Sequence, residues 1–381
     1  MTRSGYAAGI IAIFRGVRRD RRHPEKRVRF RNRPDSRCEV NAGIMSMSVV
    51  RIGIAGCGLA ARIHLDRLLA LENVEIAGCA DANLESARAL ADRASLRGGS
   101  SGNVKPVAAY SDHRELLRQQ APQALAIFTP HLTHYRVTMD ALQVGCHVFI
   151  EKPLTTNSQE AADIVSLARG RGLKVGVGHQ FRLCPSLIEA RRRVLSGEIG
   201  SVRMVTATLA RPWLSTLTRE ESSWRFDPHV ADSGILADAG DHLIDALLWT
   251  TGQKAGQVGA LQSQRDPLID LVTAAAIRLV DGTPVALAVS GIASGACFAL
   301  TYYGEDGQLH ATDHQLVEEK PESPRQEVAL PALDQTIDSN FIGALLNDTP
   351  LCCPADEALE CVRLLEAITR SAATGQFVRL I

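Results

Sequence analysis

The residues best suited to acid–base chemistry in this chain are a lysine and an aspartate–histidine pair. Lys152 lies in Glu151-Lys152-Pro153, directly after an apolar run that is typical of a β-strand. Because Pro153 restricts the backbone of the residue before it, the lysine would be aimed in one direction, toward a reacting oxygen. Asp238 and His242 stand four positions apart, so on a helix they share a face. An imidazole titrates near neutrality and suits proton transfer to or from an alcohol.

The roles within this group stay open from the residues alone. Asp238 could bind a substrate hydroxyl or hold the imidazole, and Asp245 could orient His242 from behind. An isolated Asp-x-x-x-His is more often a pair of solvated and core residues, and a lysine in a turn usually lies on the surface. Whether these residues are catalytic therefore depends on the other motifs in the chain.

A second group of residues is typical of dinucleotide binding. Residues Gly56–Ala61, which read GCGLAA, have the pattern G-x-G-x-x-A between a strand-like and a helix-like run. Gly56 permits a tight turn, Gly58 lets the backbone approach a pyrophosphate, and Ala61 allows the helix to pack closely on the strand. The start of the helix that follows supplies N–H groups and the positive end of a dipole to the phosphates.

Asp81 favours NAD over NADP as the bound dinucleotide. It stands 25 residues after Gly56 and directly follows the strand-like run Val74–Ala80. A carboxylate at this place accepts hydrogen bonds from the adenosine ribose and repels the additional phosphate of NADP. No arginine is adjacent, since Ala82 and Asn83 follow. The alternative is that Asp81 caps the next helix.

The elements that must position these groups alternate between strand and helix in the first half of the chain. Such alternation predicts βαβ units and a parallel sheet, and with the G-x-G-x-x-A turn it indicates a Rossmann domain over residues 49–180. The expected strands are Val49–Ala55, Val74–Ala80, Ala124–Phe128, His147–Ile150 and Leu173–Val177. The expected helices are Ala60–Leu71, Leu84–Ala94, Thr133–Val144 and Asn157–Arg169.

Residues 181–381 have a different pattern and predict an α+β domain. One helical stretch, Ser186–Leu195, precedes several β-rich runs, and Asp281-Gly282 and Asp306-Gly307 are hairpin signals. The strand-like runs are Val202–Leu209, Val258–Gln262, Leu271–Val280, Val285–Ser290 and Ala296–Tyr303. Two helical segments, Ile337–Leu346 and Ala355–Ala372, close the chain. We expect a large, mostly antiparallel open sheet with a few helices.

Composition excludes several classes of protein. The 381 residues are 45% hydrophobic and 22% charged, which is ordinary for a globular protein of two domains. No apolar run approaches the roughly 20 residues of a membrane-spanning helix. Nine cysteines without a Cys-x-x-Cys pair are typical of reduced thiols, and no His/Cys cluster has the spacing of a metal site. We therefore expect a cytoplasmic protein without a bound metal or a membrane partner.

The first 48 residues differ from the rest of the chain. They hold 12 Lys and Arg against 4 Asp and Glu, while the remainder holds 30 against 38. The mildly acidic remainder gives no reason to expect nucleic acid as a partner. The basic segment fits a disordered extension, or sequence translated from an upstream start, since Met45 and Met47 precede the first strand. An organellar transit peptide and a nucleic-acid-binding arm are the alternatives.

The motifs in combination resemble the Gfo/Idh/MocA oxidoreductase family over residues 49–381. They occur in the order G-x-G-x-x-A, Glu-Lys-Pro, Trp224-Arg225 and then Asp-x-Gly-x-His-x-x-Asp from Asp238. Further stretches that resemble the family are Thr129-Pro130 with His134, Val177–Arg182, and Glu366-Ala367-Ile368 followed by Ser371. Two positions depart from it: Ser233-Gly234-Ile235 where many members have consecutive glycines, and His131 where an asparagine is frequent.

The resemblance implies roles for the residues named above. Lys152 would polarise the reacting oxygen, Asp238 would position substrate and lysine, and His242 would act as general acid and base in hydride transfer between NAD and a sugar, inositol or related polyol. The implied cofactor-binding residues are Gly56, Gly58, Leu59, Ala61, Asp81, Thr129, Pro130, His134, Glu151 and Lys152. The implied substrate-binding residues are His179, Arg182, Trp224, Asp238 and His242.

The same resemblance implies an oligomeric state and two alternative functions. Family members associate through the open face of the second sheet, so we expect a homodimer or homotetramer. Similar folds also carry NAD-dependent glycoside hydrolysis through transient oxidation, and non-enzymatic dinucleotide-binding regulators. Arg211 and Trp213, like Trp224, could line a sugar pocket or simply pack in a loop.

Overall fold

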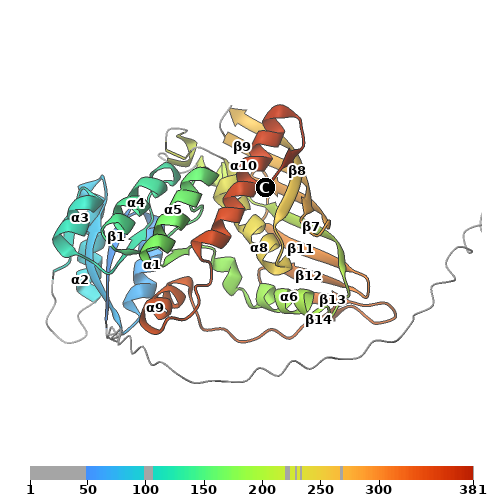
Figure 1. The fold of residues 1–381 in the computed structure, drawn as a ribbon, viewed down its shortest axis with the longest axis horizontal. Helices are drawn as coiled ribbons and strands as arrows, with labels where there is room; N and C mark the ends of the chain where they lie inside the picture. Colours follow the sequence, from blue (N-terminus) through green and yellow to red (C-terminus); the bar gives the residue numbers. More distant parts are fainter. Residues whose placement is uncertain are drawn as a thin grey trace, which may run out of the picture. The chain divides into compact units, whose positions relative to one another are not determined.

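The computed structural model describes residues 49–97, 106–218, 224–227, 230–231, 234–266 and 269–380. The basic segment before residue 49 and Ser233 lie outside these ranges, so the expectations about them concern residues that are not described. The described chain contains two β-sheets with helices packed on them (Figure 1).

The first sheet is parallel and has the Rossmann strand order β3-β2-β1-β4-β5-β6, which confirms the predicted α/β class. Its inner strands are almost continuously buried, as expected where helices cover both faces of a sheet. The strands of this sheet are β1 Val50–Ala55, β2 Val74–Ala80, β3 Ala108–Tyr110, β4 Ala124–Ile127, β5 His147–Ile150 and β6 Val175–Val177.

Helices cover the two faces of the first sheet. Helices α1 and α2 form one hydrophobic cluster with it, and α3, α4 and α5 form another on the other face. Unexpectedly, residues near the end of the chain contribute to both: α9 packs with α1, and the first half of α10 packs with α5. The helices are α1 Leu59–Leu69, α2 Leu84–Arg97, α3 His113–Gln120, α4 His134–Gln143, α5 Ser158–Arg171, α9 Ile337–Asn347 and α10 Ala355–Thr374.

The second sheet has the order β14-β13-β12-β11-β7-β10-β9-β8-β15 and is antiparallel except for the pair β7 and β10. Its side chains alternate between buried and exposed, because helices pack on one face of it. The predicted mostly antiparallel sheet is therefore confirmed. Its strands are β7 Val202–Ala210, β8 Ala255–Asp266, β9 Ile269–Leu279, β10 Pro284–Ser290, β11 Cys297–Gly304, β12 Gln308–Thr312, β13 Leu316–Glu319, β14 Gln326–Glu327 and β15 Val378–Arg379.

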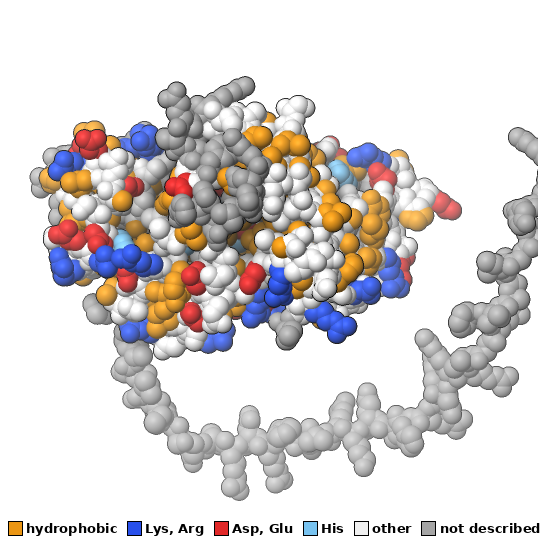
Figure 2. Space-filling view, turned by 90° about the horizontal axis from the view of Figure 1, so that it is seen from above, with side chains coloured by type: hydrophobic (Ala, Val, Ile, Leu, Met, Phe, Trp, Pro, Cys, Tyr) orange, Lys and Arg blue, Asp and Glu red, His pale blue; other side chains and the backbone are white. Residues whose placement is uncertain are grey.

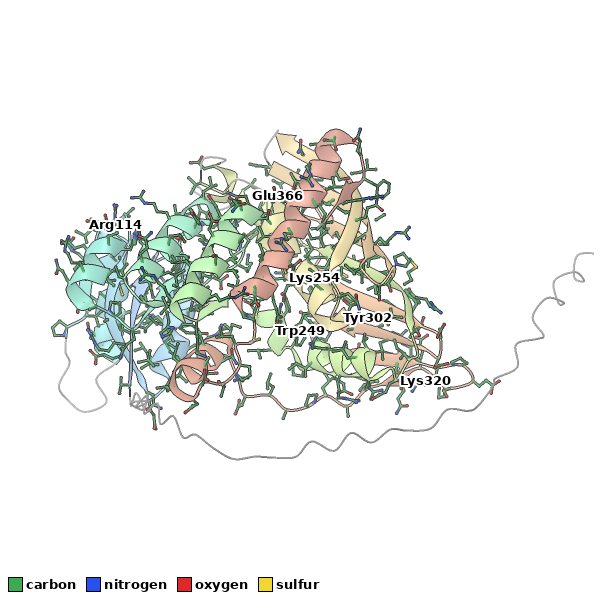
Figure 3. The ribbon with its side chains drawn as sticks, viewed as in Figure 1. Arg114, Trp249, Lys254, Tyr302, Lys320 and Glu366 are labelled. Carbon is green, nitrogen blue, oxygen red and sulfur yellow. The ribbon has the colours of Figure 1, made fainter. Side chains whose placement is uncertain are left out.

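Helices α6 and α8 and the second half of α10 complete the core of this sheet. Tyr302 lies fully buried there, with its hydroxyl 2.6 Å from Thr250 Oγ1 (Figure 3). The helices and short helical turns are α6 Pro185–Ser196, α7 Trp213–Leu217, α8 Asp241–Thr251, η1 His131–Thr133, η2 Gln180–Leu183, η3 Trp224–Phe226 and the π-helical turn η4 Leu236–Gly240.

The boundary expected between residues 180 and 181 stays a prediction, because α9 and α10 belong partly to the clusters of the first sheet. Among the described residues no helix is both long enough and apolar enough to cross a membrane. On the face shown in Figure 2, acidic and basic side chains are interspersed, so this face carries no field of a single sign.

Candidate active site

The glycine-rich turn after β1 has the geometry that dinucleotide binding requires. Gly56 has φ +84°, and a Cβ there would lie 2.6 Å from the carbonyl carbon of Phe128, so only glycine fits. Gly58, in contrast, has ordinary backbone angles and no atom within 4 Å of an added Cβ. Ala61 is fully buried beneath the turn, and Leu59 is exposed at the start of α1. Gly58 therefore leaves space on the solvent side, where a phosphate could approach the N–H groups.

A cavity of about 510 Å³ opens in front of this turn. It is formed by the carboxyl ends of β1, β2, β3 and β4, which is where ligands bind in open parallel sheets. Its wall includes Gly58, Asp81, Arg114, Thr129, Arg136 and Trp224.

Asp81 lies in the wall of this cavity and also holds the turn. Its Oδ2 accepts a hydrogen bond from Cys57 N at 2.7 Å, and its Oδ1 accepts one from Asn83 N at 2.8 Å. Asn83, not Asp81, caps α2, since its Oδ1 accepts from Glu85 N and Ser86 N. The helix-capping alternative for Asp81 is therefore wrong, and its carboxylate faces the cavity with lone pairs still available.

Two arginines that the sequence did not associate with Asp81 lie in the same wall. Arg114, on α3, donates to both carboxylate oxygens of Asp112, and this ion pair lowers the pKa of Asp112 to about 2 (Figure 3). Arg136, on α4, is exposed and has no ion pair with any residue in the described ranges. The short strand β3, which brings Arg114 here, was not predicted. The absence of an adjacent arginine in sequence therefore does not by itself exclude NADP.

The opposite wall is built by the segment after β4. Thr129 and Pro130 line the cavity, and the buried Thr129 Oγ1 has no hydrogen-bond partner among the described residues. Trp224 closes this side and contacts His131 edge to face at 4.8 Å. Burial, together with the nearby charge of Lys152, holds the pKa of His131 well below its ordinary value. A buried hydroxyl without a partner, on a residue that lines a cavity, is a group that a bound ligand could satisfy.

Lys152 and Asp238, 86 positions apart in sequence, meet beside this cavity. The Lys152 Nζ donates to the main-chain oxygen of Asp238 and lies 3.5 Å from its Oδ1. Asp238 Oδ2 accepts from Trp213 Nε1 at 2.6 Å and from Arg225 Nε at 3.0 Å. Burial alone would favour the neutral carboxyl, but the charges of Lys152 and Arg225 outweigh it and hold the pKa of Asp238 well below its ordinary value.

His242 lies one turn further along, at the start of α8. Its ring is almost fully buried against Phe181, with ring centroids 5.0 Å apart. Burial first, and then the charge of Lys152, hold its pKa well below the ordinary value, so the imidazole is neutral. His242 Nδ1 has no hydrogen-bond partner in the part of the chain that the structure describes. A neutral ring with a free nitrogen can accept a proton.

Asp245 does not orient His242, contrary to the expectation from the sequence. Both its carboxylate oxygens accept from the Arg182 guanidinium, at 2.6 to 3.0 Å. The reason is the helix itself: Asp245 lies on the side of α8 that faces η2, where Arg182 enters the core. Arg182 also stacks near the Trp249 ring, at 5.8 Å (Figure 3).

His179 and Arg182, expected to bind substrate, are both buried in this internal cluster. His179 Nε2 is 2.8 Å from Asp241 Oδ2 and its Nδ1 is 3.2 Å from Cys353 Sγ. Burial opposes the imidazolium, but the charges of Asp245 and Asp241 outweigh it and raise the pKa of His179 well above its ordinary value. Neither side chain lines the dinucleotide cavity, so a direct contact with substrate has no support in the geometry.

The same cluster holds two sets of three groups that could ligate a metal, His179 with Asp241 and Cys361, and His179 with Asp245 and Cys353. Its charges are already balanced, because two buried carboxylates face the His179 imidazolium and the Arg182 guanidinium. We therefore assign no metal to it.

His134 lies behind the site and does not line the cavity. Its Nδ1 is 2.7 Å from the Pro153 carbonyl oxygen, and its Nε2 is 2.8 Å from that of Thr129. Burial lowers its pKa, so one nitrogen donates to one of the two carbonyls. The ring thus lies between the segment after β4 and the segment after β5, with a hydrogen bond to one of them. Its direct contact with the cofactor stays a prediction.

Sequence reasoning missed a buried ion pair next to Lys152. Glu151 Oε1 lies 3.0 Å from His64 Nε2, and His64 Nδ1 lies 2.6 Å from Asp338 Oδ1. His64 and Asp338 are 274 positions apart, and neither belongs to a recognisable pattern. Only the position of His64 on the predicted helix after the glycine-rich turn could have drawn attention to it.

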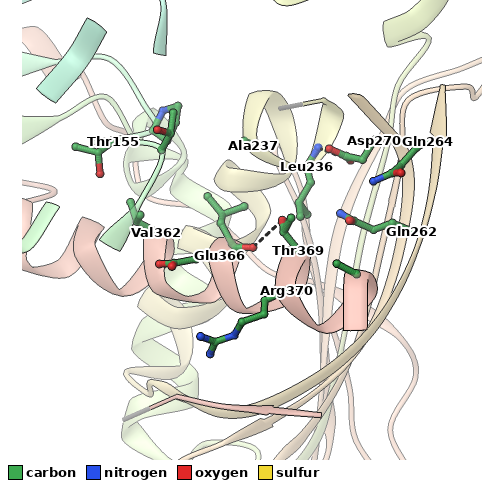
Figure 4. A pocket seen from close by; sticks show the side chains of 14 residues that line it. Thr155, Leu236, Ala237, Gln262, Gln264, Asp270, Val362, Glu366, Thr369 and Arg370 are labelled. Atoms are coloured by element: carbon green, nitrogen blue, oxygen red, sulfur yellow. Dashed lines mark hydrogen bonds between the residues drawn. The ribbon is translucent and has the colours of Figure 1, made fainter. Parts of the chain in front are cut away.

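A second cavity, of about 360 Å³, lies behind the segments that carry Lys152 and Asp238 (Figure 4). Pro153 and Ala237, their sequence neighbours, line it, and Glu366 and Arg370 of α10 lie across from Gln262 of β8. It shares no lining residue with the dinucleotide cavity, so the two are separate.

The residues of the first cavity fit a dinucleotide. The fit rests on the open space at Gly58, the Asp81 side chain at the end of β2, and the unpaired Thr129 hydroxyl. When bound there, the pyrophosphate would lie against the glycine-rich turn, and Lys152 and Asp238 would lie at the other end of the crevice.

Comparisons with known proteins agree with this geometry. Residues 50–179 match the model of the oxidoreductase family with an NAD-binding Rossmann fold, and residues 187–310 match that of the GFO/IDH/MocA C-terminal domain. D-glucoside 3-dehydrogenase of Escherichia coli (strain K12) is 26% identical over 213 residues, which are 55% of this chain and 56% of that protein. UDP-N-acetylglucosamine 3-dehydrogenase of Acidithiobacillus ferrooxidans is 29% identical over 212 residues, 56% of this chain and 58% of that protein.

The fold as a whole also matches solved structures. An inositol dehydrogenase homolog from Azotobacter vinelandii, solved in complex with NAD+, superposes with a TM-score of 0.76 at 21% identity and covers 88% of this chain and 98% of its own. The sequence matches span little more than half of the two dehydrogenases above. With both family models matched in order along one chain, the protein belongs to the GFO/IDH/MocA oxidoreductase family.

Proposed function

We propose that this protein is an NAD-dependent oxidoreductase that transfers a hydride between the nicotinamide and a carbinol carbon of a sugar, inositol or related polyol. The observation that carries the proposal is the contact between Lys152 and Asp238 beside a cavity built for a dinucleotide, with the neutral His242 one turn away. The names of the relatives, both sugar dehydrogenases, support a sugar as the substrate.

We propose that the ammonium of Lys152 donates a hydrogen bond to the reacting oxygen of the substrate. An ammonium has three N–H donors, and the contacts with the Asp238 main-chain oxygen and Oδ1 occupy two of them. The third can donate to a substrate oxygen and stabilise negative charge that develops on it. Asp238, itself held by Trp213 and Arg225, keeps this ammonium in place and compensates its charge.

We assign to His242 the transfer of the proton of the substrate hydroxyl. In the oxidative direction the O–H bond of the alcohol breaks and its proton moves to the neutral imidazole, while the C–H bond delivers its electron pair as hydride. NAD, when bound, supplies the hydride acceptor at C4 of the nicotinamide. The carbonyl product stays hydrogen-bonded to Lys152. The charge of Lys152 disfavours a lasting imidazolium, which promotes release of the proton from His242 to solvent.

For the dinucleotide we propose NAD rather than NADP. The Asp81 carboxylate lies where the adenosine ribose would bind, and it would repel a second phosphate there. Arg114, one of the two arginines that could bind such a phosphate, is held by Asp112. Arg136 has no such partner among the described residues, so the preference rests on the repulsion by Asp81.

Two other functions are compatible with a dinucleotide site, and no observation favours either. A glycoside hydrolase that works through transient oxidation would release a free sugar without net formation of NADH. A regulator would bind NAD without turnover. Net NADH formation from a free sugar separates the proposed function from both.

The test is a panel of aldoses, pyranosides and inositols incubated with NAD or NADP and followed by the absorbance of the reduced nicotinamide. Because both relatives act at position 3 of a hexose by their names, hexopyranosides with an altered 3-hydroxyl belong in the panel. The proposal predicts NADH formation with at least one member, and none when the reactive hydroxyl is replaced by hydrogen. NAD binding without turnover of any member would contradict it.

Assembly as a homodimer or homotetramer and a cytoplasmic location stay predictions. The face of the second sheet that no described helix covers carries partly exposed apolar residues on neighbouring strands, such as Met204 on β7 opposite Tyr303 on β11. Light scattering of the purified chain tests the first prediction.

A further inference from the structure

Three residues from distant parts of the chain form a buried cluster directly beside Lys152. His64 comes from α1, Glu151 follows β5, and Asp338 comes from the first turn of α9. The imidazole lies between the two carboxylates, 2.6 Å from Asp338 Oδ1 and 3.0 Å from Glu151 Oε1. The side chains of His64 and Asp338 are only 5% and 1% exposed, so this pair is shielded from water.

The ring is held on its faces as well as at its nitrogens. It stacks on Phe128, with centroids 4.7 Å apart and planes inclined by 23°, and Phe149 lies at its side at 5.3 Å. Because both nitrogens face carboxylate oxygens, both must carry hydrogen, and the ring is an imidazolium. Burial opposes this charge, but the hydrogen bonds to Asp338 and Glu151 outweigh burial and raise the pKa of His64 to about 9.

The cluster continues from Glu151 into the catalytic segment. Glu151 Oε2 accepts a hydrogen bond from the main-chain N–H of Lys152 at 3.2 Å. On its other side, a Cβ on Gly178 would lie 2.9 Å from Glu151 Oε1, so the glycine leaves the carboxylate the room that it occupies. Glu151 thus has one oxygen on the imidazolium and the other on the residue whose side chain meets Asp238.

We infer that His64 and Asp338 are positioning residues, which hold the Glu151 carboxylate and through it the backbone of Lys152 in the orientation in which its ammonium meets Asp238. The inference rests on the proposed function and extends it, since neither residue touches the cavity that would hold the dinucleotide. It makes α9, a helix from the end of the chain, part of the catalytic apparatus.

The charges that face the imidazolium define how the cluster should respond to pH. They are Asp338 on α9, Glu151 after β5, Lys152 beyond Glu151, and Arg67 on α1, whose Nη1 is 3.5 Å from Asp338 Oδ2. Removing the negative charge of Asp338 should therefore make the imidazolium easier to deprotonate. Once His64 is neutral, Glu151 loses the buried positive charge next to it and the Lys152 segment loses its anchor.

The experiment compares wild type with Asp338→Asn, His64→Gln and the control Asp66→Asn. Asp66 lies two residues from His64 on the same helix, and its carboxylate pairs with Arg93 of α2 at 2.6 Å. Two readouts are used on each variant: the titration of the His64 ring by NMR, and the pH dependence of kcat and KM with the best substrate of the panel. The NMR readout needs no substrate, so it remains valid if the proposed function fails.

Asp338→Asn should move the titration of His64 and the alkaline limb of kcat to lower pH together. At the pH where wild-type His64 is still protonated, kcat should fall by roughly tenfold to a hundredfold with little change in KM, because a misplaced catalytic group costs turnover. Asp66→Asn should move neither. If His64→Gln does not fold, the comparison of Asp338→Asn with wild type still tests the inference, because both proteins contain the His64 ring.

A common shift of both readouts supports the inference. A shift of the titration without any shift of the kcat profile, or a loss of thermal stability alone, overturns it and leaves the cluster a structural ion pair. Absence of turnover in wild type itself would instead contradict the proposed function.

Discussion

The ammonium of Lys152, on the loop that leaves β5, donates a hydrogen bond to the main-chain oxygen of Asp238 on the π-helical turn before α8. This contact connects the residues after the first sheet to a helix that packs on the second. It needs β5 to end at the crevice edge and η4 to place the Asp238 carbonyl within reach of the ammonium. Such π-turns are frequent at functional sites. In the proposed function, this contact would hold a pair of charges beside the substrate oxygen.

The two glycines of the turn after β1 should respond differently to alanine. Gly56→Ala would place a Cβ 2.6 Å from Phe128 backbone atoms at φ +84°, and should lower the free energy of unfolding by about 2 kcal/mol or more. Gly58→Ala meets open space, so it should leave the melting temperature unchanged and weaken NAD by roughly tenfold. Thermal melts with and without NAD measure both. Equal melting temperatures for the two variants, or unweakened NAD binding by Gly58→Ala, would argue against the assigned cavity.

Asp81→Ala tests the preference for NAD. The variant loses the acceptor for the ribose hydroxyls and the repulsion of a phosphate, so the affinity for NAD should fall far more than that for NADP, by roughly tenfold in their ratio. The loss of the bond from Cys57 N should affect both dinucleotides alike. Fluorescence titration with NADH and NADPH gives the two affinities. Equal losses would mean that Asp81 acts only by holding the turn.

His64 should make stability depend on pH on the alkaline side. Its pKa rises from 6.5 to about 9 on folding, so its contribution is complete below pH 6.5 and is lost as the pH rises through 9. The shift corresponds to about 3 kcal/mol as an order of magnitude. Urea unfolding at several pH values should show this decline in wild type and a flatter profile in His64→Gln. A wild-type profile that is flat between these pH values would contradict the buried imidazolium.

His242 should keep the enzyme active at mildly acidic pH. Because burial and the charge of Lys152 hold its pKa well below 6.5, the imidazole stays a base there, and the acid limb of kcat/KM for oxidation should lie below pH 6.5. His242→Asn should lower kcat by roughly a hundredfold or more. The pH–rate profiles of both proteins measure this. An acid limb at the ordinary pKa of histidine would mean that the ring is exposed in the working enzyme.

The sequence predicted the parallel sheet well because its strands are apolar runs with glycine or acidic residues at their ends. It missed β3 and α3 because β3 has only three residues and α3 is largely polar on its surface. As a result Arg114, which α3 brings into the dinucleotide cavity, had no place in the sequence-based prediction. Local patterns identify long buried elements and fail for short ones at the edge of a sheet.

The candidate site was predicted in part. The motifs identified Lys152, Asp238 and His242, which lie in local patterns, and the structure brings them to one place. Arg182 and His179 lie in an equally clear pattern, yet they face inward to Asp245 and Asp241. Which side of a short turn faces the core depends on the packing of α8 against η2, and no sequence spacing encodes that. The link from His64 to Asp338 is likewise invisible, since it joins the two ends of the described chain.

The most direct test of the central claim is NADH formation by Lys152→Met, with Lys254→Met as control. Lys254 is an exposed lysine that pairs with Glu360 at 2.8 Å, away from both cavities. With a substrate found in the panel, Lys152→Met should bind NAD as wild type does and lose turnover by roughly a hundredfold to ten-thousandfold, while the control keeps its rate. Undiminished turnover in Lys152→Met would contradict the account.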